Sequence, residues 1–580
     1  MNYCVLSIFQ VVRQFAFYPI SSNMSTKTWW KEAIVYQIYP RSFKDSNGDG
    51  VGDLRGITEK LDYIKSLGVD TVWLNPIYKT PNDDGGYDIS GYNDIQPEFG
   101  TMEDFNDLLR GLHTRGLRLI MDLVVNHSSD EHPWFVESRT TKDNPYRDFY
   151  FWRTGKNGGP PNNWLSFFGG NAWQLDQTTG EYYLHLFSKK QPDLNWENPA
   201  LRNEIHKLMK FWLDKGVDGL RLDVISAISK RTNFPDTDTM DFNETIRKFY
   251  ANGPRLKEFI REMRTIVWNK YDLLTVGEGP GITPDNAEDY LDKEHGLNMI
   301  FHFGHMFLDQ GPGGRFDPVP WSMRDFKKVF KTWDEAFIKR GWGSIFLGNH
   351  DFARMVSRWG DDKKYWSLSS KLLGTLLLSM RGTPFIFQGD EFGMTNMELN
   401  SVEDSMDIET HNGWSEARKR GLTEEQFVKI ANYAGRDNAR TPMQWDGSTQ
   451  AGFTTGIPWM KVNSNKDAIN VLYQQSEPDS VLEYFKRMTN LRKTNPILVY
   501  GQYIPVETEN ENLFVYYRIW EIEKWLVVLN FSSETIVFPP ELTIRKAMKM
   551  IGNYSTVDLL DSARPWEAVI LRLGDGDELS

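Results

Sequence analysis

The stretch Gly216-Val217-Asp218-Gly219-Leu220-Arg221-Leu222-Asp223-Val224-Ile225-Ser226 decides the fold that we predict for this chain. Between positions 220 and 225 apolar residues alternate with Arg221 and Asp223, which is typical of a short β-strand. Side chains two apart on a strand point the same way, so Arg221 is expected beside the Asp223 carboxylate. A nearby guanidinium keeps a carboxylate ionised, and an ionised, oriented carboxylate can act as a nucleophile. A buried ion pair that only stabilises the strand end would give the same pattern.

Short apolar runs followed by helix-like stretches recur on both sides of this strand. The predicted strands lie at residues 33–39, 71–74, 117–125, 220–223, 273–276, 299–301, 345–347 and 384–387. Predicted helices include residues 57–67, 102–115, 201–213 and 481–492. A doubly wound sheet shares this alternation, but eight β-then-α units with polar residues at many strand ends favour a (β/α)8 TIM barrel, an α/β fold.

Two segments are too long to be simple connections in a barrel. Residues 128–197 predict an inserted subdomain that contains β-structure after the third strand, and residues 390–460 predict a second insertion after the eighth strand. Strand patterns at residues 513–519, 525–531 and 568–573 predict a C-terminal all-β sandwich domain. The predicted domains are therefore 24–127 with 198–495 for the barrel, 128–197 for the inserted subdomain and 496–580 for the C-terminal domain.

The composition narrows the class of partner. The 580-residue chain has 66 basic and 79 acidic residues, a net charge of −13, which argues against a nucleic-acid or anionic-membrane partner and suits a neutral substrate. Cys4 is the only cysteine, so no intrachain disulfide is possible, as expected of a reducing compartment. We predict a cytoplasmic monomer.

The N-terminal segment differs from the rest of the chain. Its apolar run, residues 3–20, contains Gln10 and Arg13 and lacks a basic start and a small-residue cleavage signal, so it is a poor signal peptide and a poor membrane helix. We interpret residues 1–23 as an upstream extension of the reading frame or a disordered tail, with a weak cleaved signal as the lesser alternative.

Charged residues gather where the predicted strands end, which is the catalytic face of such a barrel. The ends supply the set Asp122, Asn126, His127, Arg221, Asp223, Glu278, His350 and Asp351. Paired carboxylates on neighbouring elements are the machinery of glycoside hydrolysis. Arg221 makes Asp223 the candidate nucleophile, and Glu278, without a basic neighbour in its own stretch, the candidate proton donor.

Several motifs identify the chain as similar to glycoside hydrolase family 13, the α-amylase family, and most to its oligo-1,6-glucosidase and α-glucosidase group. The matching stretches are YQIYPRSF at 36–43, DLVVNH at 122–127, QPDLNW at 191–196, GLRLDV at 219–224, GE at 277–278, NHD at 349–351 and RDNARTPMQW at 436–445. The resemblance extends over nearly the whole chain, from about residue 29 to residue 573.

The resemblance implies a retaining mechanism, with Asp223 as nucleophile, Glu278 as acid/base and Asp351 as transition-state stabiliser. Retention implies that the two catalytic carboxyls lie about 5–5.5 Å apart. The resemblance further implies that the terminal glucose is held by Asp84, Tyr87, His127, Arg221, His350 and Arg436. Phe168, Phe187 and Gln191 of the inserted subdomain are expected to wall the site, although core packing also accounts for these three and for Tyr87.

Four positions concern the leaving group. The resemblance implies that valine directly after the nucleophile, here Val224, accompanies α-1,6 cleavage, whereas barrel packing would also explain it. Phe352-Ala353 stands where that group usually has Gln-Pro, and Gly279 where a larger residue is common. These departures leave the preferred leaving group open.

The loop from Asp45 to Asp53 places oxygen-bearing side chains at alternate positions around glycines, like the first part of an EF-hand loop without its final glutamate. The resemblance implies a structural calcium ion there and no organic cofactor. The implied ligands are the side chains of Asp45, Asn47, Asp49 and Asp53 and the carbonyl of Val51. A solvated acidic turn is the alternative.

The leading interpretation is an exo-acting α-glucosidase that hydrolyses terminal α-1,6-linked glucose from isomaltose and short isomalto-oligosaccharides. The first alternative is a broader α-1,4-glucosidase or sucrase, or a transglucosylase such as a sucrose isomerase. Those isomerases carry an Arg-rich loop after the sixth strand, which residues 306–312 lack. A non-catalytic barrel associated with transporters is the remote alternative.

Overall fold

The computed structural model describes residues 27–574 except 240, 509, 539–541, 543–546 and 557–560. Its centre is a sheet of eight parallel strands in the order β11-β10-β9-β5-β2-β1-β15-β14. The strands are β1 Val35–Ile38, β2 Thr71–Leu74, β5 Arg118–Val124, β9 Gly219–Asp223, β10 Leu274–Gly277, β11 Met299–Ile300, β14 Ser344–Ile345 and β15 Thr383–Phe387. Because β15 pairs with β1, the first and eighth strands are neighbours, and the predicted (β/α)8 barrel is confirmed.

A side chain joins the two end strands of the sheet. β11 and β14 are the two end strands of the sheet order. The Ser344 hydroxyl on β14 donates to the Ile300 carbonyl on β11 at 2.9 Å. A side-chain hydrogen bond thus takes the place of a backbone pair where both strands are short.

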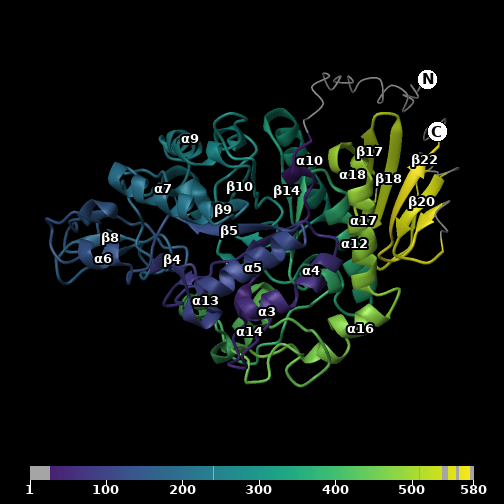
Figure 1. Ribbon diagram of the computed structural model, residues 1–580, viewed down its shortest axis with the longest axis horizontal. Helices are drawn as coiled ribbons and strands as arrows, with labels where there is room; N and C mark the ends of the chain where they lie inside the picture. The colour runs from purple at the N-terminus through teal and green to yellow at the C-terminus, as the bar shows by residue number, and fades with distance from the viewer. Residues whose placement is uncertain are drawn as a thin grey trace.

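Helices cover the outside of the barrel (Figure 1). They are α3 Leu54–Glu59, α4 Leu61–Ser66, α5 Met102–Thr114, α7 Pro199–Asp214, α9 Leu256–Ile266, α10 Met323–Arg340, α12 Trp366–Ser379 and α17 Val481–Thr494. Side-chain caps begin several of them, such as Asp53 on Gly56 and Thr101 on Asp104. The apolar face of each helix packs on strands that are buried along their length.

Two predicted elements differ from the structure. The helix predicted at 57–67 begins earlier, at Leu54, and is divided into α3 and α4 at Lys60, whose backbone leaves the helical region. The seventh strand, predicted at 345–347, ends at Ile345. The Phe346 carbonyl accepts from His305 at 2.7 Å and the Leu347 carbonyl accepts from Trp359 at 2.9 Å, so side chains take the acceptors that a longer strand needs.

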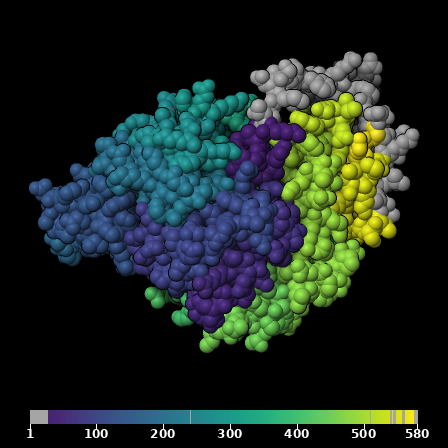
Figure 2. All heavy atoms as spheres, in the orientation of Figure 1, coloured from purple at the N-terminus to yellow at the C-terminus, as the bar shows by residue number. Residues whose placement is uncertain are grey.

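The segment after the third strand projects from the barrel, in blue at the left of Figures 1 and 2. It contains α6 Pro133–Ser138 and a small antiparallel sheet of β6 Trp152–Arg153, β8 Tyr182–Leu184 and β7 Trp173–Leu175. Its own apolar cluster includes Trp164, Leu186 and Phe234. The segment therefore has β-structure, as predicted, and a core that residues beyond the fourth strand help to form.

The segment after the eighth strand has helices as its regular structure, namely α13 Ile408–Lys419, α14 Glu424–Ala434, α15 Asp437–Arg440 and α16 Val471–Ser476. A hairpin of β12 Gln310–Gly311 and β13 Gly314–Pro318 packs against it, with Phe316 buried beside Phe427. Earlier in the chain, β3 Tyr78–Lys79 and β4 Gly91–Ile95 form another short hairpin. These additions lie around the ends of the barrel strands.

The C-terminal part is an antiparallel sheet of β16 Gln502–Val506, β17 Leu513–Trp520, β18 Glu523–Asn530, β22 Ala568–Leu573 and β20 Ala547–Gly552. Its residues alternate between two faces. Phe514, Tyr516 and Val527 pack with the barrel core, whereas Val515 and Val528 pack with the pair β19 Ile536–Val537 and β21 Ser562–Ala563. Both faces are buried, as the predicted sandwich requires.

No helix among the described residues is long and apolar enough to cross a membrane. The predictions for residues 1–23 and for Cys4 concern positions outside the described residues. The exact domain boundaries stay predictions.

Candidate active site

The Arg221 guanidinium lies at the centre of the site and contacts three carboxylates. It is buried on β9, pairs with Asp223 of the same strand at 2.5 Å, and also pairs with Asp122 of β5. Its other terminal nitrogen lies 3.0 Å from Glu278, which directly follows β10. Three adjacent strands thus deliver their acids to one cation, and the expected proximity of Arg221 and Asp223 is present.

Glu278 has no basic neighbour in its own stretch of sequence, but in the folded chain Arg221 contacts it as well as Asp223. The neighbouring strand supplies this contact, which sequence spacing along β10 does not show.

The roles of the two acids therefore depend on how they share protons. Burial raises the pKa of Glu278 and raises that of Asp223 well above its ordinary value, and Arg221 opposes the rise in each case. The Glu278 carboxylate also raises the pKa of Asp223, so the titrations of the two acids are linked. The contact of Arg221 with Asp223 is shorter than its contact with Glu278, which favours the ionised form of Asp223 against the effect of burial. The Val224 backbone N–H lies 3.2 Å from Glu278 Oε2 and orients it.

Asp351 lies in a separate set of cations. Its Oδ1 accepts from Arg440 at 2.9 Å and from Arg436 at 3.4 Å, and its Oδ2 lies 3.1 Å from His350 Nε2. Burial alone raises the pKa of Asp351, but His350 and the two guanidinium groups outweigh it and hold the pKa below its ordinary value. Asp351 is therefore ionised beside the Asp223–Glu278 pair.

The residues predicted to hold the terminal glucose form a connected group. Arg436 donates to Asp84 at 3.0 Å, and Gln191 Nε2 donates to the other Asp84 oxygen at 3.1 Å. The same Gln191 nitrogen lies 3.2 Å from His127 Nε2. Burial lowers the pKa of His127 to about 4, so its ring is neutral at pH 7. The barrel, the inserted subdomain and the second insertion thus meet in one polar group.

Aromatic rings line this group. Tyr87 stacks on His350 with ring centroids 5.2 Å apart, and its hydroxyl accepts from Asn75 at 2.7 Å. Arg436 lies over the Phe168 ring at 5.1 Å, and Phe187 lies 5.1 Å from the His127 ring. These rings lie beside the polar group and also pack on its members. Their positions are compatible with both predicted interpretations, a wall of the sugar site and core packing.

Val224 has an unusual backbone for a β-branched residue, with φ +45° and ψ +38° in the left-handed region. Its side chain belongs to the apolar cluster that includes Leu184 and Leu186 of the inserted subdomain, so Val224 has a packing role there. Gly279 is explained by space, because a Cβ there would lie 2.2 Å from Ser226 Oγ. A larger residue at position 279 would require Ser226 to move.

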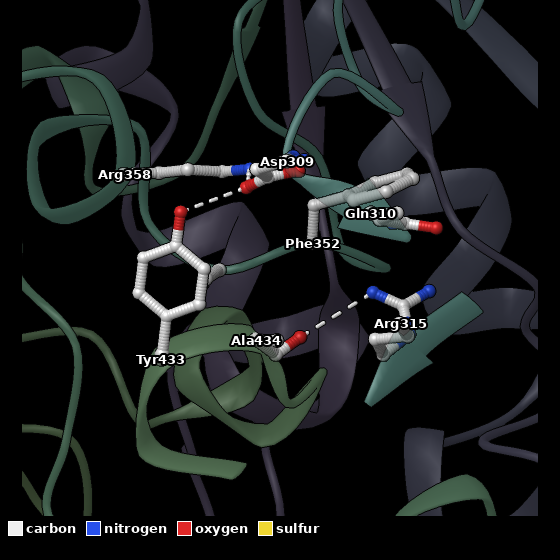
Figure 3. A pocket seen from close by; sticks show the side chains of 8 residues that line it. Asp309, Gln310, Arg315, Phe352, Arg358, Tyr433 and Ala434 are labelled. Atoms are coloured by element: carbon white, nitrogen blue, oxygen red, sulfur yellow. Dashed lines mark hydrogen bonds and ion pairs between the residues drawn. The ribbon is translucent and has the colours of Figure 1, made fainter. Parts of the chain in front are cut away.

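A narrow cavity lies beside Asp351, lined by Asp309, Gln310, Arg315, Phe352, Ala353, Arg358, Tyr433 and Ala434 (Figure 3). The guanidinium groups of Arg315 and Arg358 lie 4.8 and 5.0 Å from the Phe352 ring centre. Tyr433 donates to Asp309, which also pairs with Arg358. Phe352 is thus held between two cations on the side where the leaving group was expected.

The loop Asp45 to Asp53 is held by hydrogen bonds to its own backbone. Asp45 accepts from the backbone N–H groups of residues 47, 48 and 50 and from the Thr454 hydroxyl, which uses its four acceptor positions. Asn47 Oδ1 and Asp49 Oδ1 each accept one backbone N–H. No group of three His, Cys, Asp or Glu side chains placed to hold a metal occurs in the described part of the chain. The oxygen ligands suit calcium in kind, and Asn47 and Asp49 retain acceptor capacity for it.

Three residues of the site were not among those that the sequence analysis assigned to catalysis or sugar binding. Asp122, noted at its strand end but not selected, is fully buried and accepts from Trp73 at 2.8 Å and Tyr87 at 3.3 Å. Arg440 follows Arg436 by one helical turn, a spacing that could have identified it. Asp407, which pairs with Arg436 at 2.6 Å, comes from a helix N-cap in the second insertion and has no local signal.

Comparison with known families gives a match to the α-amylase catalytic domain over residues 37–501. Among curated proteins, the chain is 53% identical over 557 residues to the oligo-1,6-glucosidase of Parageobacillus thermoglucosidasius, which covers 94% of this chain and 99% of that protein. It is 49% identical over 556 residues to the oligo-1,6-glucosidase of Bacillus cereus, covering 94% of this chain and 100% of that protein.

Solved structures of similar proteins match the fold of nearly the whole chain. The fold is similar to the trehalulose synthase MutB of Pseudomonas mesoacidophila MX-45, with a TM-score of 0.91, 43% identity and coverage of 94% of this chain and 100% of that one. It is equally similar to the isomaltulose synthase of Klebsiella sp. LX3, with a TM-score of 0.91, 43% identity and coverage of 95% and 100%.

Proposed function

Because this chain belongs to the α-amylase family of glycoside hydrolases, we propose that it is a retaining, exo-acting α-glucosidase of the oligo-1,6-glucosidase type. Its substrates are isomaltose and short isomalto-oligosaccharides, from which it releases the terminal α-1,6-linked glucose. The names of its curated relatives, at about half identity over nearly the full length, support this choice of linkage.

The reaction proceeds in two displacements. Asp223 attacks the anomeric carbon and forms the glycosyl–enzyme bond while the glycosidic C–O bond breaks, and Glu278 gives its proton to the leaving oxygen. Glu278, now a carboxylate, takes a proton from water, whose oxygen attacks the same carbon and releases Asp223. Asp351, kept ionised by Arg436 and Arg440, stabilises the positive charge that develops on the sugar.

One observation carries this proposal: a single guanidinium contacts both acids. Arg221 pairs with Asp223 at 2.5 Å and with Glu278 at 3.0 Å. Carboxylates that share a cation are close enough for one to act as nucleophile and the other as acid on the same bond. The polar group of Asp84, Gln191, His127 and Arg436 beside them supplies hydrogen-bonding partners for sugar hydroxyls.

The stereochemical outcome tests the mechanism. Purified enzyme is mixed with isomaltose, and proton NMR follows the anomers of the released glucose before they equilibrate. Two inversions at one carbon give retention, so the α-anomer appears first. If the β-anomer appears first, the reaction inverts the configuration, and direct attack of water would have to be assigned in place of the covalent intermediate.

A transglucosylase is the second candidate, because the similar solved structures are sucrose isomerases. The same glycosyl–enzyme bond would then be attacked by a sugar hydroxyl. Products from sucrose decide between the two: glucose and fructose indicate hydrolysis, and an isomeric disaccharide as main product indicates transfer.

The loop Asp45 to Asp53 supports a proposal of structural calcium binding through Asp45, Asn47, Asp49, Asp53 and the Val51 carbonyl. A bound calcium ion would supply a fixed positive charge that neutralises the loop. Because Asp45 already accepts four donors, binding requires it to exchange one of them. Excess chelator should lower the melting temperature, since an ion bound by the native state stabilises it by mass action. An unchanged melting temperature and no metal in the purified protein would leave the acidic turn as the interpretation.

We also propose a cytoplasmic monomer with no nucleic-acid partner. The net charge of −13 and the single cysteine support this proposal. Light scattering of the purified protein tests the monomer, and a mass of two chains would exclude it.

A further inference from the structure

We propose that Arg354 is a positioning residue that fixes the short helix α15, so that the guanidinium of Arg440 stays on Asp351. Arg440 is the last residue of α15; its Nη2 donates to Asp351 Oδ1 at 2.9 Å and its Nε donates to the His350 carbonyl at 3.0 Å. Arg354 follows Asp351 by three positions and is fully buried. The kinetic part of this inference rests on the proposed function, in which Asp351 stabilises the charge that develops on the sugar.

The Arg354 guanidinium uses each of its three nitrogens on a different backbone carbonyl. Its Nη1 donates to Gln388, directly after β15, at 2.5 Å, while its Nε donates to Asn438 at 3.3 Å and its Nη2 to Ala439 at 3.1 Å. The guanidinium also lies 5.1 Å from the ring centre of Phe387. Because an arginine only donates and a carbonyl only accepts, the direction of these bonds is fixed. Arg354 therefore ties α15 to the end of the eighth barrel strand.

The two α15 carbonyls in this set cannot be satisfied by the helix itself. In an α-helix each carbonyl accepts from the N–H four residues later. For Asn438 that residue is Pro442, which has no N–H, and for Ala439 it is Met443, whose N–H donates to the Ser42 carbonyl at 2.8 Å. A one-turn helix has little stability of its own, so a buried guanidinium supplies here the bonds that a longer helix would supply.

Arg440 depends on α15 more than Arg436 does. Arg436, at the start of the helix, lies 3.4 Å from Asp351 but also pairs with Asp84 at 3.0 Å and with Asp407 at 2.6 Å. Arg440 lies 4.0 Å from Asp407, and its shorter ion pair is the one with Asp351. If the last turn of α15 moves, Arg436 keeps two carboxylate partners from other segments, whereas Arg440 moves away from Asp351. The effect of the fixed helix on the reaction therefore passes through Arg440.

Hydrogen exchange tests the structural step without any substrate. Arg354→Met removes the three donors. Arg492→Met is the matched control, since Arg492 is also fully buried and donates to backbone carbonyls at and after the end of α12. Mass spectrometry of peptides that cover residues 436–441 should show faster exchange in Arg354→Met than in the parent, because local opening of α15 becomes easier. Arg492→Met should leave the local exchange of these peptides unchanged.

A double-mutant cycle tests whether the kinetic effect passes through Arg440. We expect Arg354→Met to lower kcat on isomaltose about 100-fold, the scale of a catalytic group displaced by about 1 Å, with KM changed much less. Arg440→Met should lower kcat by a similar or larger factor. Since Arg354 acts through Arg440, the double variant should have the kcat of Arg440→Met alone, whereas two independent effects would multiply.

Arg354→Lys separates position from charge, and it carries the same test if Arg354→Met does not fold. Lysine keeps a buried positive charge but lacks the planar fork that reaches three carbonyls. We expect faster exchange in α15 and part of the same fall in kcat for Arg354→Lys. Arg492→Met should keep the kcat of the parent.

Four outcomes would overturn the proposal. They are parent exchange rates for α15 in Arg354→Met, a kcat in Arg354→Met equal to that of the parent, factors that multiply in the double variant, and full activity in Arg354→Lys. Because hydrogen exchange needs no substrate, a parent that does not hydrolyse isomaltose would contradict the proposed function, and the exchange result would still decide whether Arg354 holds α15.

Discussion

Buried arginines at two places in this molecule have opposite kinds of partners. Arg221, at the catalytic end of the barrel, contacts three carboxylates. Arg492 on α17 and Arg518 on β17, where the C-terminal sheet meets the barrel, donate only to backbone carbonyls and form no ion pair in the described part of the chain. The acceptors of Arg492 are the carbonyls of Leu378, Met380, Gly382 and Leu498, and those of Arg518 are the carbonyls of Ser379, Leu498 and Gly501.

The carbonyls of Leu378 and Ser379 belong to the last turn of α12, the negative end of its dipole. Burial lowers the pKa of Arg492 to about 9 and of Arg518 to about 10, whereas the carboxylates around Arg221 hold its pKa above the ordinary value. A buried arginine can therefore have two uses. Beside carboxylates it controls the charge of groups that gain and lose protons, and beside backbone carbonyls it stabilises the fold.

The largest expected effect is on the catalytic side. Asp223→Asn and Glu278→Gln should each lower kcat on isomaltose about 10,000-fold or more, because nucleophile and proton donor act in the same steps. Circular dichroism should stay unchanged. Asp176→Asn is the control, since Asp176 is another buried partner of an arginine, Arg139, outside the site. Near-normal turnover by either catalytic variant would exclude the assigned mechanism.

At the contact between the C-terminal sheet and the barrel, a substitution should lower stability and leave catalysis unchanged. Arg492→Met removes the guanidinium donor from the carbonyls of Leu378, Met380 and Gly382, so the free energy of unfolding should fall by about 3 kcal/mol or more. The kcat/KM of the folded fraction should stay unchanged. Arg487→Met, at an exposed position on the same helix, is the control. If Arg492→Met lowers kcat/KM without lowering the free energy of unfolding, the claim that Arg492 acts only on stability is wrong.

His302 and His305 extend the comparison to pH. Burial lowers the pKa of His302 well below its ordinary value and that of His305 to about 3. Unfolded histidine binds a proton near pH 6.5, so stability is full above that pH and falls as the pH drops toward 3. Each ring should cost about 2 kcal/mol at pH 5 relative to pH 7. Urea titrations measure this slope, which His305→Phe should reduce; an unchanged slope would mean that other groups cause it.

The smallest expected effect is on linkage preference. We expect a higher kcat/KM on isomaltose than on maltose, and Val224→Thr should move that ratio toward maltose by about 1–3 kcal/mol in transition-state energy. Threonine keeps the β-branch, so the left-handed backbone at this position is equally unfavourable in both proteins. A parent that prefers maltose, or a ratio that Val224→Thr does not change, would show that Val224 only packs against the inserted subdomain.

Much of the fold could be predicted because it depends on local patterns. The strand Thr71–Leu74 and the helix from Met102 have the predicted limits to within one residue, since alternation and a Thr cap are written in adjacent positions. The seventh strand was misplaced because His305 and Trp359, far along the chain, take its carbonyls. The candidate site was predictable where motifs follow strand ends, as with Asp223, and not where Asp407 arrives from an insertion.

The sequence alone determined the barrel, the family resemblance and the acids at the strand ends, because periodicity and motifs depend on neighbours in the chain. Only the tertiary structure decided that Arg221 contacts Glu278 as well as Asp223, that Val224 packs on the inserted subdomain, and that Lys230 donates to Asn126. These contacts join residues from different strands and insertions. Such residues become neighbours only when the chain folds, and their separation along the sequence does not indicate their distance in space.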